Sequence, residues 1–209
     1  MSRRPYNWLQ AVEHLQGRCG RLAGFIDGFG AKRLPLRSEG NLFSSLARSI
    51  AYQQLSSKAA GTIHGRFEAL FPGASPNAET AVGLPVQSLR AVGLSQAKTL
   101  SILDLAEKSL AGELPTQRKM GGMSDDEIIT AFCHVRGIGP WTAQMYLIFN
   151  LGRPDVMPAS DLAIQKGVQN IYRMRQLPKP DKVLTKTRHL RPFRSVASWY
   201  FWRASKMPG

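Results

Sequence analysis

The sequence predicts an all-α protein, because helical periodicity runs through nearly the whole chain while the alternation typical of strands is almost absent. Residues that cap helices precede several apolar stretches, and glycine or proline follows them. With 209 residues and 43% hydrophobic side chains, the chain can bury a sizeable core in one domain or in two small lobes.

Three helices are expected between residues 42 and 112, and the first two have apolar residues spaced to form one face. The first face comprises Leu42, Phe43, Leu46, Ala47, Ile50 and Ala51, and the second comprises Ala60, Ile63, Phe67 and Phe71. The third helix carries Leu100, Leu103, Ala106 and Leu110. Pro72-Gly73 ends the second helix, Ser95 can cap the third, and Gly112 lies just beyond its end.

Two further helices are expected on either side of a short turn. Residues 124–127 read S-D-D-E, the form of a capping box, and Ile128, Ile129 and Phe132 follow on the buried side. The turn contains Gly137, Gly139 and Pro140, and the next helix covers residues 141–149. A helix from about Asp161, a basic segment and a final helix rich in aromatic residues complete the chain.

The charge and composition of the chain limit the kinds of binding partner to be considered. The formal net charge of +14 makes a polyanion the first partner to consider, with a generally soluble basic surface as the alternative. No apolar run reaches the length of a membrane span and no signal segment follows the N-terminus, so we expect a soluble intracellular protein with no membrane partner. The cysteines, Cys19 and Cys133, are too few for a disulfide framework. No histidines stand in a metal-binding spacing, so no metal is expected.

The turn at residues 137–140 is suited to an anion. A Gly-x-Gly turn lets the backbone reverse, and proline is favoured in the first turn of the following helix. Backbone amides then point outward at a helix N-terminus, where the dipole is positive and a DNA phosphate can bind. An ordinary connection between two helices is the alternative.

The surrounding residues resemble the helix-hairpin-helix DNA glycosylase superfamily, specifically its 3-methyladenine DNA glycosylase II branch. The four stretches that carry the resemblance are AYQQLSSKAAGTIHGRF (residues 51–67), VRGIGPWTAQMYLIF (135–149), RPDVMPASDLAIQKG (153–167) and RPFRSVASWYFWR (191–203). The resemblance implies two helical lobes, one of residues 1–36 with 156–209 and the other of residues 37–155, which contains the helix-hairpin-helix at about 124–150. It also implies a cleft between the lobes for DNA and the damaged base. No cofactor is required, although a monovalent cation (Na⁺ or K⁺) held by hairpin carbonyls is implied.

The family pattern marks Asp161 as catalytic. The residue follows a proline-containing loop at the start of a helix, where the positive end of the dipole favours an ionised carboxylate. Such a charge can stabilise the positive sugar that forms as an N-glycosidic bond breaks, and it can help to orient the attacking water. A plain N-cap is the alternative.

Several aromatic positions match the family's base pocket. Trp141 stands where the members that also cut the DNA strand carry a lysine nucleophile, so the resemblance implies a monofunctional enzyme. Trp141 and Trp202 match aromatic walls suited to an electron-poor alkylated base, although both fit a core as well. At the third wall, where some members carry an aromatic residue, this chain has Met145, with Tyr146 next to it.

Other positions match residues that contact DNA in the family. They are Gln53, Gln54, Gly137, Ile138, Gly139, Thr142 and Arg194. Gln54 matches the side chain that fills the gap left by a flipped base, the alternative being a solvated amide at a helix end. Residues 173–194 carry eight Lys or Arg against the single acid Asp181, and they either follow the DNA backbone or are only solvated.

The expected function is therefore that of a monofunctional DNA glycosylase in base excision repair. It would act as a monomer on double-stranded DNA and excise alkylated purines such as 3-methyladenine and 7-methylguanine. Two alternatives stay open: a non-catalytic helix-hairpin-helix DNA-binding module, and a bifunctional glycosylase-lyase.

Overall fold

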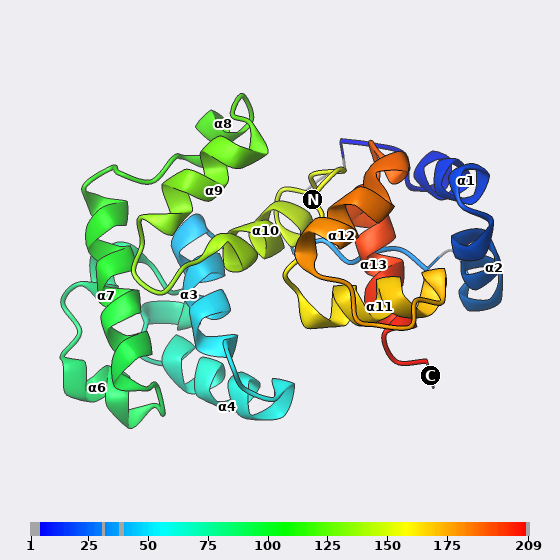
Figure 1. Cartoon of the computed structure of the whole chain (residues 1–209). Coiled ribbons are helices and arrows are strands. Elements are labelled where there is room, and N and C mark those ends of the chain that lie inside the picture. The colour runs from blue at the N-terminus through cyan, green and yellow to red at the C-terminus, as the bar shows by residue number, and fades with distance from the viewer. Residues whose placement is uncertain (1–4, 31, 38–39, 208–209) are drawn as a thin grey trace. The chain divides into compact units, whose positions relative to one another are not determined.

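The computed structural model describes residues 5–30, 32–37 and 40–207, and every regular element in this part of the chain is helical (Figure 1). The fold class expected from the sequence is thus confirmed. The chain divides into two compact units, unit 1 with Met1–Arg37 and Leu147–Gly209, and unit 2 with Ser38–Tyr146. The second boundary falls inside a helix, earlier than the expected division after residue 155.

Unit 2 is built from short helices with well-defined starts. They are α3 (Leu42–Tyr52), α4 (Ser57–Glu68), η1 (Pro72–Ala74), α5 (Ala78–Ala81), α6 (Val86–Ala91), α7 (Gln96–Leu110), α8 (Gln117–Met120), α9 (Asp125–Cys133) and the first part of α10 (Pro140–Phe149). Six of these helices have an N-cap side chain that accepts a hydrogen bond from the N–H three residues on: Asn41, Ser56, Asn77, Ser95, Thr116 and Ser124. The cap at Ser95 and the capping box at Ser124 are as predicted.

The core of unit 2 forms where α7 packs on α3 and α5. The predicted face of α3 is confirmed for Phe43, Leu46, Ala47, Ile50 and Ala51, which are all buried. Phe71 lies beyond the end of α4 rather than in it, and its ring contacts that of Phe67 with the centroids 4.9 Å apart.

The helix expected after Ser95 is α7, and its buried side is set by residues other than the leucines noted in the sequence. The structure buries Thr99, Ile102 and Leu105, whereas Leu110, at the end of the helix, is 47% exposed. Of the four apolar residues noted in the sequence, Ala106 alone is fully buried. Apolar residues stand on several sides of this helix, so periodicity does not select one stripe, and the contacts with α3 and α5 do.

Unit 1 joins the two ends of the chain. Its helices are α1 (Trp8–Arg18), α2 (Gly20–Phe29), the last part of α10, α11 (Leu162–Tyr172), α12 (Pro180–Thr187), η2 (Arg188–Leu190) and α13 (Arg194–Ala204). The most extensive helix contact pairs α11 with α13. Gly167 makes this packing possible, because a Cβ there would overlap the backbone of Phe201.

The basic segment 173–194 is folded. It forms α12 and η2, which bury Val183, Thr187 and Leu190 while the lysines of α12 stay exposed. Among the described residues, no helix combines the length and the apolar character that crossing a membrane requires.

Candidate functional site

The turn between α9 and α10 forms the expected hairpin. Gly137 has a φ of 73°, and a Cβ there would lie 2.5 Å from Oγ of Ser101, so the fold needs glycine for both reasons. Gly139 differs, because its φ is not positive and a Cβ there would meet nothing within 4 Å. Ile138 is 4% exposed and anchors the turn in the core of unit 2. Of the two glycines, therefore, only Gly137 is demanded by the fold.

Two side chains, those of Asp104 and Gln53, hold the hairpin through hydrogen bonds to its backbone. Oδ2 of Asp104, on α7, accepts a hydrogen bond from the backbone N–H of Arg136 at 2.7 Å. Burial alone would raise the pKa of the Asp104 carboxyl, but the hydrogen bonds from Lys108 and Arg136 and their positive charges together lower it. The carboxylate is therefore charged at neutral pH and holds the start of the turn.

Gln53, the C-cap residue of α3, provides the second support. Its Nε2 donates to the carbonyl of Gly137 at 2.9 Å and to Oγ1 of Thr142 at 3.3 Å. Thr142 is itself buried, with 3% of its surface exposed. The structure thus brings together three of the expected DNA-contacting residues, but the amide of Gln53 and the hydroxyl of Thr142 bond within the protein.

Gln54 occupies the turn between α3 and α4. Its φ of 56° is unusual for a residue with a side chain, and the side chain is exposed. Leu55, which follows, is 41% exposed, and Ser56 caps α4. The turn therefore presents two side chains of moderate length to solvent beside the end of α3.

Asp161 is the N-cap of α11, as its sequence setting predicts. Its Oδ1 accepts a hydrogen bond from the N–H of Ile164 at 2.9 Å, and its own N–H donates to the carbonyl of Pro158 at 3.0 Å. The carboxylate therefore lies at the N-terminus of α11, where the helix dipole is positive. The side chain is neither fully buried nor fully exposed.

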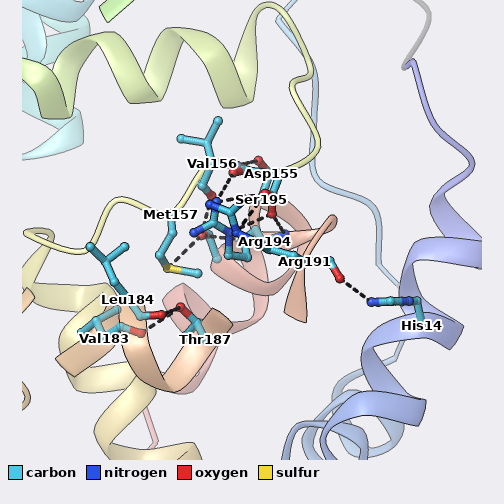
Figure 2. Close-up of polar contacts among 11 residues, drawn as sticks. His14, Asp155, Val156, Met157, Val183, Leu184, Thr187, Arg191, Arg194 and Ser195 are labelled. Atoms are coloured by element: carbon cyan, nitrogen blue, oxygen red, sulfur yellow. Dashed lines mark hydrogen bonds and ion pairs between the residues drawn. The ribbon is translucent and has the colours of Figure 1, made fainter. Parts of the chain in front are cut away.

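The loop that leads to Asp161 is fastened to the start of α13 (Figure 2). Arg194 donates from Nε to Oδ1 of Asp155 at 2.8 Å and from Nη2 to Oδ2 at 2.9 Å, which makes a bidentate ion pair. The hydroxyl of Ser195 accepts from the N–H of Val156, and the N–H of Ser195 donates to the carbonyl of Pro154, both at 2.9 Å. These bonds fix the loop at residues 154–156, five residues before Asp161.

This arrangement gives Arg194 a different place from the one expected. Arg194 is 9% exposed and its guanidinium is engaged by Asp155, so a DNA phosphate would have to compete with this half-buried ion pair. We therefore assign Arg194 to holding the loop and leave it out of the proposed DNA contacts.

The expected pocket residues lie in different surroundings. Trp141, in unit 2, is 41% exposed and so is not a core residue. Trp202, in unit 1, stacks on Phe149 with the ring centroids 5.6 Å apart and the planes at 23°. Met145 is half-buried. Tyr146 is 5% exposed against Phe132, and burial raises the pKa of its hydroxyl to about 12, which places it in the core of unit 2 rather than on a pocket wall.

The candidate residues are divided between the two units. Unit 2 carries the hairpin, the Gln54 turn and Trp141, and unit 1 carries Asp161 and Trp202. Sequence reasoning missed two residues that shape the first part, Lys98 and Asp104, because a polar residue in a helix gives no periodic signal. Within the described residues, no cluster of three His, Cys, Asp or Glu side chains could hold a metal ion.

Comparison with known proteins identifies the family. Residues 47–192 match the HhH-GPD superfamily base excision DNA repair protein family, and this span covers more than half of the chain. The protein therefore belongs to the HhH-GPD superfamily of base excision DNA repair proteins.

The similarity extends to individual relatives. DNA-3-methyladenine glycosylase 1 of Schizosaccharomyces pombe is 38% identical over 79% of this chain and 73% of its own length. A structure of 3-methyladenine DNA glycosylase (Mag1) from the same yeast, in complex with abasic DNA, has a TM-score of 0.87 and 34% identity, and the match covers 95% of this chain and 97% of that one. A DNA-3-methyladenine glycosidase from Bacillus halodurans has a TM-score of 0.84 and 33% identity, with 94% and 89% covered.

Proposed function

We propose that this protein is a monofunctional DNA glycosylase that removes alkylated purines, among them 3-methyladenine and 7-methylguanine, from double-stranded DNA as a monomer. The observation that carries the proposal is Asp161, a carboxylate fixed at the N-terminus of α11 behind a loop held by the Asp155–Arg194 pair. The names of the relatives, which are 3-methyladenine glycosylases, support the same substrate class.

The carboxylate of Asp161 acts on the sugar. As the N-glycosidic bond lengthens, positive charge develops on the deoxyribose, and a fixed negative charge stabilises that state more than the ground state. The same carboxylate orients the water that attacks the anomeric carbon. Alkylation at a ring nitrogen makes the purine cationic and a good leaving group, so the reaction needs no strong general acid at this site.

Trp141 supports a monofunctional reaction. Tryptophan has no amine that could form a Schiff base with the sugar, so the product would be an intact strand with an abasic site. Its exposed ring provides instead a face on which an electron-poor base can stack. Trp202, whose ring stacks on Phe149, is the other aromatic side chain that we propose for the base pocket.

The hairpin would bind the DNA backbone. The fold does not require glycine at position 139, and the missing side chain there would let a phosphate approach the backbone at the start of α10 closely. Arg136 is exposed beside it and adds a positive charge. Gln54, held at a positive φ and pointing into solvent, suits the filling of the gap that a flipped base leaves.

The monovalent cation implied by the family fits the donor chemistry of the turn. The residues between α9 and α10 offer backbone carbonyl oxygens, which are suitable ligands for Na⁺ or K⁺, although the carbonyl of Gly137 is already an acceptor for Gln53. A cation held there would add positive charge next to the DNA phosphate. The steps assigned to Asp161 and Trp141 do not pass through it.

The direct test is incubation of the protein with duplexes that each carry one defined lesion, followed by identification of the released base. Release of free 3-methyladenine, with the strand left uncut until alkali is added, is the expected result. Strand cleavage without alkali, together with a covalent adduct trapped by borohydride, would favour the glycosylase-lyase. Tight binding without base release would favour the non-catalytic module.

A further inference from the structure

Lys98 makes an unusual set of contacts for a lysine at the start of a helix. Its Nζ donates to the backbone carbonyls of Ala51 and Gln53, both at 2.8 Å, at the C-terminal end of α3. The side chain is half-buried, and burial lowers the pKa of its ammonium group. Neither acceptor belongs to α7, the helix that carries the lysine.

The helix dipoles indicate which of the two helices the charge of Lys98 stabilises. Lys98 lies in the first turn of α7, where the helix dipole is positive and disfavours a cation. The same ammonium group lies at the C-terminus of α3, where the dipole is negative and unpaired carbonyls need donors. The contacts therefore stabilise the end of α3 at a cost to α7.

The end of α3 is joined in turn to the hairpin. Gln53, whose carbonyl accepts from Lys98, donates through its side chain to the carbonyl of Gly137. Gln54, the next residue, is the one held at a φ of 56°. One continuous set of hydrogen bonds thus runs from Lys98 through Gln53 to the hairpin, with the Gln54 turn attached at its middle.

We propose that Lys98 and Gln53 are positioning residues. They hold the gap-filling turn at Gln54 and the phosphate-binding hairpin in a fixed position relative to each other. The proposal rests on the proposed function, since it assigns a role in engaging duplex with a missing base. Because the Gln54 turn and the hairpin are both fixed to Gln53, a duplex that fits one of them is already placed for the other. Loss of either positioning residue uncouples the two contacts without removing a group that touches DNA.

The test compares binding to an abasic-site duplex with binding to the same duplex intact, at one salt concentration. The variants are Lys98→Met and Gln53→Met, which keep the apolar stems, and the double variant. Arg90→Met is the matched control, because Arg90 also donates to a backbone carbonyl of unit 2, that of Leu94 at 3.0 Å, away from Gln53 and the hairpin. Thermal unfolding of each protein is recorded alongside.

Each single variant should lose roughly tenfold in affinity for the abasic-site duplex and much less for the intact one. The double variant should lose no more than the worse single variant, because the two residues are links in one chain of hydrogen bonds that breaking either link interrupts. Lys98→Arg, which keeps a cationic donor, should retain most of the parent protein's affinity for the abasic-site duplex. A role confined to stability would instead lower the unfolding temperature and leave the ratio of the two affinities unchanged.

Two outcomes would overturn the inference alone: losses that multiply in the double variant, or an affinity ratio equal to that of Arg90→Met. If Lys98→Met does not fold, Gln53→Met carries the same comparison, since Gln53 lies outside the helix and is half-exposed. A parent protein that binds both duplexes equally would reject the proposed function and this inference together.

Discussion

At the scale of single residues, Asp161 shows how one side chain serves structure and chemistry. As an N-cap it satisfies the N–H of Ile164, and in the proposed mechanism its carboxylate supplies the negative charge that the reaction needs. A cap requires only an oxygen acceptor, whereas the reaction requires a negative charge. Substitution by asparagine separates these two requirements.

Asp161→Asn should therefore fold with nearly unchanged stability, because an asparagine oxygen caps a helix as well as a carboxylate does. The excision rate should fall at least a hundredfold, which corresponds to the loss of on the order of 3 kcal/mol of transition-state stabilisation. Single-turnover release of 3-methyladenine, with an unfolding curve as the folding control, measures both quantities. A folded variant that works at the parent rate would disprove the catalytic assignment.

Gln54 illustrates the opposite relation, in which a residue is unfavourable for the fold. Its φ of 56° is costly for a side chain, and glycine adopts this conformation without strain. Gln54→Gly should thus leave stability unchanged or raise it by up to about 1 kcal/mol.

The same variant should bind an abasic-site duplex more weakly, since nothing is left to fill the gap. Titration of both duplexes and chemical unfolding of both proteins check the two expectations. Equal losses of affinity for abasic and intact DNA would show that Gln54 is only a surface amide.

At the scale of elements, the hairpin depends on more than its own sequence. Asp104 on α7 and Gln53 at the end of α3 hold the turn from two sides, and Ser101 on α7 lies directly against Gly137. A short glycine-containing turn is flexible in isolation. These contacts restrict the turn, as the proposed phosphate site requires.

The two glycines of the hairpin should respond differently to substitution. Gly137→Ala should destabilise the protein by about 1–3 kcal/mol, because the added Cβ would lie 2.5 Å from Oγ of Ser101 and the residue has a positive φ. Gly139→Ala meets no neighbouring atom and should leave stability unchanged.

Binding of intact duplex provides the second readout for this pair. Gly139→Ala should weaken it severalfold while the protein stays as stable as the parent, because the methyl group lies where a phosphate would approach the backbone. A Gly139→Ala protein that binds DNA like the parent would remove this glycine from the phosphate site.

At the scale of the whole molecule, the positive charge is the dominant electrostatic property. A net charge of +14 on 209 residues raises the local concentration of any polyanion and strengthens non-specific binding to duplex DNA. Part of this charge lies on the exposed lysines of α12, in unit 1, and part beside the hairpin, in unit 2.

The affinity for undamaged duplex should fall steeply as salt increases, with a log–log slope of roughly 0.9 for each phosphate neutralised. Charge removal at Lys182 and Lys186, both exposed on α12, tests whether the basic segment takes part. If the log–log slope falls in magnitude by about one or more, the segment contacts the DNA backbone. If the slope is unchanged, the segment is only solvated. A nearly flat dependence in the parent protein would argue against DNA as the partner.

Much of the local structure could be predicted because it depends on neighbours in the chain. The cap at Ser95, the capping box at Ser124, the start of α11 at Asp161 and the helix over 141–149 all follow from residues within one or two turns. The weaker predictions concern the helices of unit 1. The sequence reasoning placed no helices at α1 and α2, although Asn7 caps α1, and it described the region of α12 only as a basic segment.

The sequence by itself therefore determined the helical class, the hairpin, the charge and the position of the candidate carboxylate, since these depend on residue type and short-range hydrogen bonding. The tertiary structure decided which side of α7 is buried, that Tyr146 belongs to the core, and that Arg194 is held by Asp155. It also revealed the path from Lys98 through Gln53 to Gly137. These features join residues far apart in the chain, and no local pattern encodes a contact whose partner is chosen by packing.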